Sequence, residues 1–219
     1  CANSPWEHVN FLSEVASHGF LVIAIGTMPR PVQGGGTRST SSQLTDAIDW
    51  AIAENSDKTS QYYNKLDITK IAVSGMSCGG LQTLEVAPDP RVTTAVICNS
   101  GILSDPGRGM AGMPKLTKDQ LEKLYTPILY ILGGESDIAY NNGMDDFHRI
   151  NHVPVFMANL NVGHGGTYGR LHGGEFAVVA AAWYKWQLKG DKDAAKMFIG
   201  KSCGLSQISG WKVEKKNIP

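Results

Sequence analysis

The 219-residue sequence has no excess of either charge. Lys and Arg together number 20, Asp and Glu also number 20, and charged residues make up 18% of the chain. Without a field of one sign, the chain has no electrostatic means of holding nucleic acid or an anionic membrane surface. Its apolar runs are too short to span a bilayer. These absences favour a domain that acts on a small or neutral molecule.

Cysteine is scarce and scattered. Cys1, Cys78, Cys98 and Cys203 form no CxxC pair and no cluster with histidine, so nothing in the sequence indicates a zinc site. Buried free thiols and one or two disulfides are both compatible with this spacing. No glycosylation sequon is present, and no signal peptide, which a mature chain would have lost. We expect secretion, slightly ahead of a cytoplasmic location.

Hydrophobic patterns of helix and strand alternate along the chain, without repeats or low-complexity linkers. The expected helices are His8–His18, Ser42–Glu54, Leu81–Ala87, Gly143–Asn151 and Gly174–Leu188. The expected strands are Phe20–Ile25, Ile71–Ser74, Val92–Cys98, Pro127–Leu132 and Val153–Leu160. This alternation predicts one α/β domain over residues 1–219, a three-layer α/β/α sandwich around a mostly parallel sheet. The tail over residues 203–219 is expected to be irregular, with a short extended piece at Trp211–Glu214.

A glycine-rich turn follows the strand Ile71–Ser74. Its sequence is GMSCGG, with Ser77 at the centre and a helical stretch after it. A strand–turn–helix of this kind lifts a serine hydroxyl above the sheet edge, and Gly75, Gly79 and Gly80 would make room for the close approach. The turn also places the backbone N–H of Cys78 at a helix N-terminus, where it can stabilise an oxyanion. We therefore expect Ser77 to be a nucleophile.

A serine nucleophile needs an imidazole to take its proton. His164 lies in the glycine loop NVGHGG directly after the strand that ends at Leu160, and catalytic groups gather at the carboxyl ends of strands in such sheets. His172, a few residues later, is the alternative. The other histidines fall in or beside expected helices, where a capping or solvated role is the simpler interpretation.

The acid that orients the imidazole is expected between the serine and the histidine. Asp137, in GGESDIAY, follows the strand that ends at Leu132, and its structural alternative is a helix N-cap. Glu135 is its near rival, and Asp105, after the preceding strand, is a positional one. Asp145 and Asp146 fall on the next expected helix.

With Ser77, Asp137 and His164 in this order, the chain resembles the α/β-hydrolase superfamily. Within it, the sequence is most similar to small esterases of the dienelactone-hydrolase, chlorophyllase and cutinase-like polyester-hydrolase branch, fungal members in particular. The segments that carry the resemblance are ASHGFLVIAIG, GMSCGG, GGESD and NVGHGG. It implies a Ser-His-Asp triad that hydrolyses carboxylic esters through an acyl-enzyme, without metal or cofactor. A serine peptidase on the same fold and a catalytically inactive binding protein are the alternatives.

The resemblance also implies a loop that supplies a second oxyanion donor, which here would be Cys1 or Ala2. In the family a strand precedes that loop and lies between the strand like Phe20–Ile25 and the nucleophile strand. No such strand is visible in this sequence, so we expect the sheet to lack its N-terminal strands in this chain. We expect a separate N-terminal segment to complete it, or the missing strands to have been lost by processing or poor order, unless Phe20–Ile25 pairs directly with Ile71–Ser74.

Three further expectations concern the disulfides, the lid and the acyl pocket. Cys1 and Cys78 would lie close enough to form a disulfide, which leaves Cys98 for Cys203, although four cysteines allow three connectivities. The stretch Gly101–Thr126 is too short for an extensive lid, which favours short or exposed esters, including polyesters, over long-chain lipids. Met76, Met110 and Met113 are candidates for an acyl pocket, with plain core packing as the alternative.

Overall fold

The computed structural model describes residues 4–27 and 38–219. Its centre is a five-stranded sheet in the order β1-β2-β3-β4-β5. The strands are β1 (Ile71–Met76), β2 (Val92–Cys98), β3 (Ile128–Leu132), β4 (Val155–Leu160) and β5 (Trp211–Lys216). β1 to β4 are parallel, and β5 runs antiparallel to β4. The mostly parallel sheet of the sequence prediction is confirmed.

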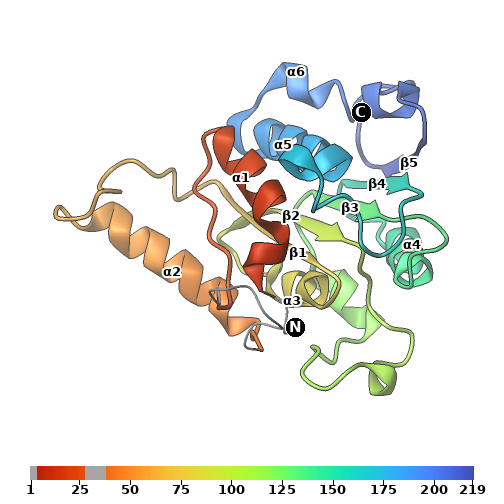
Figure 1. Cartoon of the computed structure of the whole chain (residues 1–219), viewed down its shortest axis with the longest axis horizontal. Helices are drawn as coiled ribbons and strands as arrows, with labels where there is room; N and C mark the ends of the chain where they lie inside the picture. The colour runs from red at the N-terminus through yellow and green to blue at the C-terminus, as the bar shows by residue number, and fades with distance from the viewer. Residues whose placement is uncertain (1–3, 28–37) are drawn as a thin grey trace.

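Helices cover both faces of this sheet (Figure 1). The α-helices are α1 (Val9–Ser17), α2 (Ser42–Ser56), α3 (Cys78–Val86), α4 (Tyr140–Arg149), α5 (Gly174–Lys189) and α6 (Lys192–Ala195). The short 3-10 helices are η1 (Pro5–His8), η2 (Pro106–Arg108), η3 (Lys118–Lys123), η4 (Leu171–Gly173) and η5 (Gly204–Gln207). α1 and α5 pack on one face, and α2, α3 and α4 on the other. The three layers expected from the sequence are therefore present.

β3 shows why its apolar run is continuous. Ile128, Tyr130 and Leu132 pack toward α3 and α4, whereas Leu129 and Ile131 pack toward α5, and all five side chains are fully buried. A parallel strand with helices on both faces has no side that needs polar residues. The centre of the sheet is thus a rigid base for the loops at the carboxyl ends of its strands.

The segment Phe20–Ile25 is not a strand, and this prediction is wrong. Residues 20–26 form no backbone–backbone hydrogen bond with any described residue, and β1 is paired with β2 alone among the described strands. Strand structure requires a neighbouring strand as well as an apolar run, and the structure places none beside this segment. The direct pairing of Phe20–Ile25 with β1 that would have made a further strand unnecessary does not occur.

The C-terminal tail is more regular than the sequence indicates. η5 and then β5 occupy most of it, and β5 is longer than the expected extended piece at Trp211–Glu214. Lys216 at its end donates through Nζ to the carbonyl oxygens of Phe147, His148 and Ile150, at the end of α4. A lysine in this place satisfies helix carbonyls that lack an intrahelical partner. The tail therefore closes the β4 edge of the sheet.

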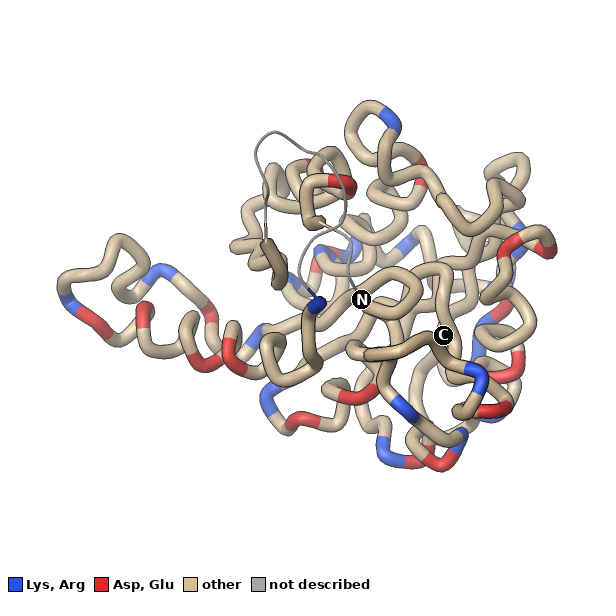
Figure 2. The backbone as a smooth tube through the Cα atoms, turned by 60° about the horizontal axis from the view of Figure 1, so that its bottom comes forward, with Lys and Arg blue, Asp and Glu red and all other residues tan. Residues whose placement is uncertain are grey.

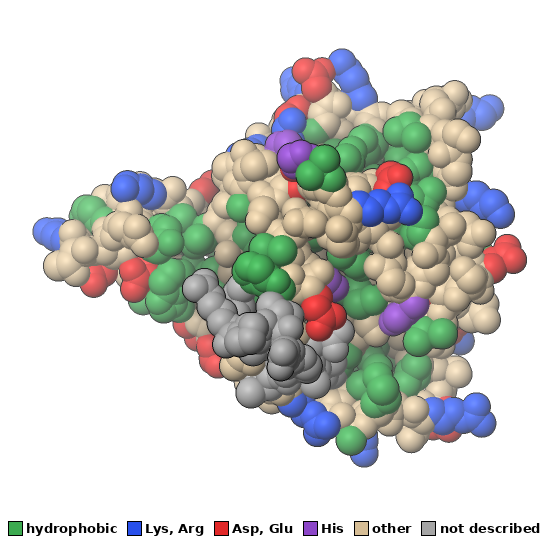
Figure 3. Space-filling view, in the orientation of Figure 1, with side chains coloured by type: hydrophobic (Ala, Val, Ile, Leu, Met, Phe, Trp, Pro, Cys, Tyr) green, Lys and Arg blue, Asp and Glu red, His purple; other side chains and the backbone are tan. Residues whose placement is uncertain are grey.

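Charged residues of both signs are mixed over the whole described chain, without a region of one sign (Figure 2). In the face seen in Figure 3, basic side chains lie mostly around the outline, with acidic ones between them.

No helix in the described part of the chain is long and apolar enough to cross a membrane.

Candidate active site

Ser77 lies at the sharp turn between β1 and α3. Its backbone has φ 54° and ψ −117°, a conformation that residues with a side chain rarely adopt. Two hydrogen bonds hold this turn to the end of β2: the Ser77 amide donates to the Cys98 carbonyl at 2.9 Å, and the Ser100 hydroxyl donates to the Ser77 carbonyl at 2.6 Å. The serine is therefore fixed above the sheet edge, as the sequence predicts.

The glycines around Ser77 differ in what they provide. A Cβ at Gly75 would come within 2.1 Å of the Gly79 carbonyl oxygen, and one at Gly80 within 2.3 Å of the Ser100 Cβ. A Cβ at Gly79 would meet no atom of the described residues within 4 Å. Gly75 and Gly80 thus permit the close approach of strand and helix, whereas the same role expected for Gly79 is wrong.

His164 lies on the loop after β4, next to Ser77. Its Nε2 is 3.0 Å from the Ser77 Oγ, and its Nδ1 is 2.6 Å from the Asp137 Oδ1. The loop is fastened to the end of β3, because the amides of Val162 and Gly163 both donate to the Gly133 carbonyl. A Cβ at Gly133 would lie 2.0 Å from the Gly163 carbonyl oxygen, so this contact requires glycine there.

Asp137 is buried, with 3% of its surface exposed, after the end of β3. Besides His164, Oδ1 accepts the Ala139 amide at 2.9 Å, and Oδ2 accepts the Asn99 side-chain amide at 2.8 Å and the Gly133 amide at 3.2 Å. Four donors compensate for the loss of water around the carboxylate. The N-cap of α4 is Ala139, so Asp137 does not cap this helix as the alternative interpretation expected, and its bond to the Ala139 amide closes the turn before the helix.

Ser77, His164 and Asp137 therefore form one hydrogen-bonded chain, drawn from the carboxyl ends of β1, β4 and β3. A hydroxyl, an imidazole and a carboxylate in this order can pass the serine proton to the imidazole and stabilise the resulting cation. In the part of the chain that is described, no group of three or more His, Cys, Asp or Glu is placed to hold a metal ion.

Sequence analysis missed Asn99, which lies directly after β2. It is fully buried, has φ 44°, and joins Asp137 to Tyr168, whose hydroxyl donates to the Asn99 Oδ1 at 2.9 Å. Burial raises the pKa of Tyr168 well above its usual value, so this hydroxyl stays a donor. His8 stacks on the Tyr168 ring at 4.3 Å. The strand-end position of Asn99 is the signal that was available.

The alternatives to Asp137 and His164 lie elsewhere. Glu135 is exposed, Asp105 caps η2, and His172 lies 3.0 Å from Glu14 on α1. Asp145 and Asp146 pair with Lys118 beneath the sheet edge. Burial raises the pKa of Asp146 to about 6, although Lys118, the Ile102 amide and Tyr130 all contact it.

The predicted oxyanion and pocket residues are only partly accounted for. Cys78 is the buried first residue of α3, as expected, whereas Cys1 and Ala2 lie outside the described residues. Met76 ends β1 and packs toward α5. Met110 is 69% exposed and Met113 lines a separate cavity of about 550 Å³, and the acyl pocket expected from the three methionines stays a prediction.

The cysteines contradict one of the two expected disulfides. Cys98 and Cys203 are buried free thiols, so their pairing is wrong. Cys98 ends β2 in the centre of the sheet, where burial raises its thiol pKa to about 12, while Cys203 precedes η5. The pairing of Cys78 with Cys1 involves a residue outside the described part of the chain and stays a prediction.

The first half of the sequence is similar to known hydrolases. Residues 3–102, just under half of the chain, match the PET hydrolase-like family. Two cutinases of Thermobifida alba, est1 and est2, are each 40% identical over 73 residues, which are 33% of this chain. Those residues span 23% and 22% of the two cutinases, so the chain matches less than a quarter of either relative. Neither similarity supports the expected fungal type.

Solved structures share the fold at low sequence identity. The esterase domain of a Rhodothermus marinus protein has a TM-score of 0.59 at 15% identity, covering 84% of this chain and 82% of its own. A fungal esterase structure from Rhizomucor miehei has a TM-score of 0.59 at 13% identity, covering 86% and 71%. A Pyrococcus horikoshii acylaminoacyl peptidase has a TM-score of 0.55 at 14% identity, covering 72% and 30%. The chain thus has an α/β-hydrolase fold and esterase-like sequence in its first half.

Proposed function

We propose that this protein is a serine esterase in which Ser77, His164 and Asp137 act as nucleophile, general base and orienting acid. The observation that carries the proposal is the continuous hydrogen-bonded chain from the Ser77 Oγ through both His164 nitrogens to the Asp137 carboxylate. The similarity to cutinases and PET hydrolase-like proteins supports a carboxylic ester as the substrate class.

The reaction has two steps. Ser77 attacks the ester carbonyl carbon while His164 takes its proton on Nε2, and the tetrahedral intermediate expels the alcohol, which receives that proton. Water then attacks the acyl-serine with His164 again as base, which releases the acid and restores the Ser77 hydroxyl. The Cys78 backbone amide, at the start of α3, is our candidate for one oxyanion donor, and Cys1 or Ala2 for the second.

Short or solvent-exposed esters, polyesters among them, are the proposed substrates. Between β2 and β3 the segment 101–126 contains just two short 3-10 helices, η2 and η3. Such a rim leaves the serine open to a bulky chain but offers little apolar surface to enclose a long acyl group. We also propose secretion; a Cys1–Cys78 cross-link in protein purified from culture medium would support it, because disulfides persist in oxidising compartments.

Active-site labelling tests the function. A fluorophosphonate probe should label wild-type protein at Ser77, as located by peptide mapping, and Ser77→Ala should abolish both labelling and hydrolysis of p-nitrophenyl esters. Ser104→Ala is the matched control, because Ser104 is exposed on the neighbouring loop and should leave both unchanged. Folded wild-type protein that neither labels nor hydrolyses any ester would contradict the proposal.

The substrate range is measured separately. Across p-nitrophenyl esters of increasing acyl length, kcat/KM should fall as the acyl chain outgrows the short rim. A rise toward long chains would show that this part of the proposal is wrong.

A further inference from the structure

Asp146 on α4 is a fully buried carboxylate that the proposed reaction does not use. Its Oδ1 accepts from the Lys118 Nζ at 2.6 Å, and its Oδ2 accepts the Ile102 amide at 2.8 Å and the Tyr130 hydroxyl at 3.2 Å. A buried ion pair contributes little net stability, because the loss of water around both charges offsets their attraction. The reason for burying this carboxylate is therefore better sought in what its partners hold in place.

The segment 99–102, directly after β2, contacts two members of the proposed triad. The Asn99 side-chain amide donates to the Asp137 Oδ2 at 2.8 Å. The hydroxyl of the next residue, Ser100, donates to the Ser77 carbonyl at 2.6 Å. Two successive residues thus hold the acid and the nucleophile turn, so a shift of this segment would displace both groups at once.

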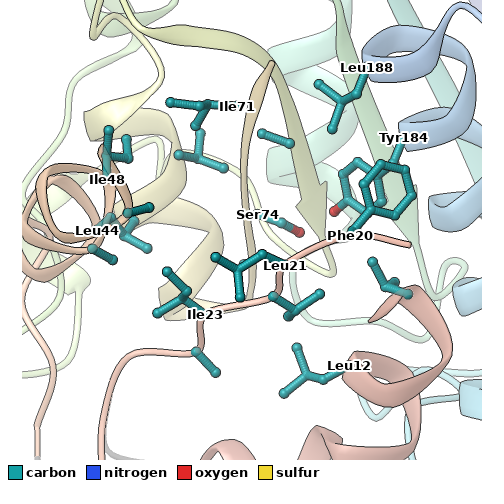
Figure 4. Close-up of a pocket in the computed structure, with 18 of the residues that line it drawn as sticks. Leu12, Phe20, Leu21, Ile23, Leu44, Ile48, Ile71, Ser74, Tyr184 and Leu188 are labelled. Atoms are coloured by element: carbon teal, nitrogen blue, oxygen red, sulfur yellow. The ribbon is translucent and has the colours of Figure 1, made fainter. Parts of the chain in front are cut away.

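β1, the strand that leads into Ser77, pairs on one side only among the described strands. Its other side faces a groove of about 1010 Å³, where Ile71 and Ser74 lie across from the extended segment that contains Ile23 (Figure 4). In the described chain, the hydrogen bonds that fasten the Ser77 turn to the sheet come from the β2 side, among them that from the Ser77 amide to the Cys98 carbonyl. The position of the segment after β2 therefore determines the position of the nucleophile.

α4 packs on segment 99–102 so closely that side chains are excluded from the contact. A Cβ at Gly101 would lie 2.3 Å from the Gly143 amide nitrogen, and a Cβ at Gly143 would lie 2.7 Å from the Ser100 carbonyl oxygen. The Ile102 amide, one residue further on, is the group that Asp146 accepts. Backbones in contact can slide past one another, whereas a directional hydrogen bond to a charged acceptor fixes their register.

Lys118 holds the other oxygen of this carboxylate. It begins η3, has 14% of its side chain exposed, and also lies 2.8 Å from the Asp145 Oδ2 and 3.3 Å from the Asn142 carbonyl oxygen. With Lys118 on Oδ1, the carboxylate directs Oδ2 at the Ile102 amide. The pair of Asp146 and Lys118 thus links α4, η3 and the segment after β2.

We propose that Asp146 and Lys118 are positioning residues, which hold segment 99–102 so that the triad stays aligned. The inference rests on the proposed function, because the alignment matters for the reaction of Ser77. Neither residue touches the reacting atoms, and both act through the backbone of the segment. A displacement of about 1 Å at a reacting group can slow a reaction about 100-fold, so loss of the pair should lower kcat and leave KM nearly unchanged.

A double variant removes the pair without leaving one buried charge alone. Asp146→Leu with Lys118→Met should lower kcat about 10- to 100-fold per active site, with KM within about twofold of wild type. Active sites are counted by fluorophosphonate titration to completion, so unfolded molecules do not enter the rate. Tm should fall as well, because the Ile102 amide and the Tyr130 hydroxyl lose their acceptor.

A second double variant restores the acceptor without the charges. Asp146→Asn with Lys118→Met keeps an oxygen for the Ile102 amide, and its NH2 group can donate to the Asn142 carbonyl that Lys118 now contacts. Its kcat per active site should return to within about threefold of wild type. The difference between the two double variants isolates the hydrogen bond to the segment.

Thr94→Val is the control for loss of stability alone. The buried Thr94 hydroxyl, at the opposite end of β2, accepts the Trp183 indole N–H at 2.8 Å and donates to the Pro127 carbonyl at 2.6 Å. Its removal should lower Tm while kcat per active site stays within about twofold of wild type.

Amide hydrogen exchange gives a readout that does not depend on activity. In Asp146→Leu with Lys118→Met, the Ser77 and Asn99 amides should exchange about tenfold faster or more than in Thr94→Val, whereas residues 211–216 should exchange alike in both. Both amides are hydrogen-bonded within the sheet in wild type, to the carbonyl groups of Cys98 and Ile131.

Three results would overturn the positioning role. The first is an unchanged kcat per active site in the Leu and Met variant, and the second is an equal loss of kcat in Thr94→Val. The third is a failure of the Asn and Met variant to recover activity. Wild-type protein that neither labels nor hydrolyses esters would contradict the esterase proposal instead, and the exchange of the Ser77 and Asn99 amides would then decide the positioning role alone.

Discussion

The two edges of the sheet differ in how they are finished. At one edge, β5 pairs with β4 over six residues and Lys216 satisfies the carbonyl groups at the end of α4. At the other, β1 faces a groove of about 1010 Å³ and the segment Phe20–Ile25 lies across it without pairing. One side of the molecule is therefore closed by its own chain, and the other is not.

The groups that we propose to be catalytic follow this division. His164, Asp137 and Asn99 all come from the closed side, after β4, β3 and β2. Ser77 alone comes from β1, and its amide and carbonyl are hydrogen-bonded to Cys98 and Ser100 of the closed side. The difference teaches that the geometry of the triad is set on the closed side, while the open side determines how firmly β1 is held.

Replacing the buried acid tests the closed side most severely. Asp137→Asn should lower kcat about 10⁴-fold, because an amide in this place favours the wrong histidine tautomer. Steady-state kinetics check this, and Tm should also fall, because the amide NH2 would face two of the four donors that the carboxylate now accepts from. Glu135→Gln, two residues away and exposed, is the control that should leave kcat unchanged. The reverse result would assign the acid to Glu135.

Truncating one apolar side chain on each side compares their contributions to stability. Leu129→Ala, in fully buried β3, should lower the free energy of unfolding by about 2–5 kcal/mol. Ile23→Ala, on the groove wall with 40% exposure, should lower it by less than about 1 kcal/mol. Urea denaturation measures both. Equal decreases in the free energy of unfolding would mean that Ile23 is packed as tightly as the core residue Leu129.

Removing the Asn99 side chain tests how the acid is held. Asn99→Gly keeps the positive φ available while it removes the amide that donates to Asp137. Loss of a hydrogen bond to a charged group should lower kcat roughly 10- to 100-fold with KM nearly unchanged. Tyr168→Phe, one link further away, should have a smaller effect. An increase in KM with kcat nearly unchanged would instead place Asn99 in substrate binding.

Substituting the glycines of the turn should have the smallest effect on the protein, and two adjacent glycines should respond differently. Gly80→Ala should lower the free energy of unfolding by about 1–3 kcal/mol, because its Cβ would overlap Ser100. Gly79→Ala, whose Cβ meets none of the described residues within 4 Å, should be neutral or slightly stabilising in the helix. Thermal unfolding of the two variants side by side measures the difference. Equal destabilisation would contradict the geometry of the turn.

The closed side was the easier one to predict from sequence. Val92–Cys98 matches β2 in both bounds, and β3 and β4 differ from their predictions by one or two residues at one end. Their apolar runs are long and their neighbours come from the same chain. Asp137 and His164 were predicted because each follows such a strand in the expected order, and Ser77 was predicted from the glycine-rich turn after β1.

The rest depended on contacts that sequence does not contain. Phe20–Ile25 has the residues of a strand but no partner, and hydrogen-bond pairing cannot be read from one segment. The helix expected to begin at Gly143 begins at Tyr140 instead. Glycine is needed inside it, because a Cβ at position 143 would come 2.7 Å from the Ser100 carbonyl oxygen. Asn99 and Tyr168 act on Asp137 only through the folded arrangement of three separate loops.

The backbone angle of Ser77 has a consequence for the evolution of this protein. A residue with a side chain held at φ 54° costs the fold of the order of 1–3 kcal/mol. Ser77→Gly should therefore raise the free energy of unfolding by about 1 kcal/mol, measured by denaturant titration, while removing the nucleophile. Selection for stability alone would favour glycine at this position. Selection for a nucleophile would instead retain serine at this position, at a cost in stability.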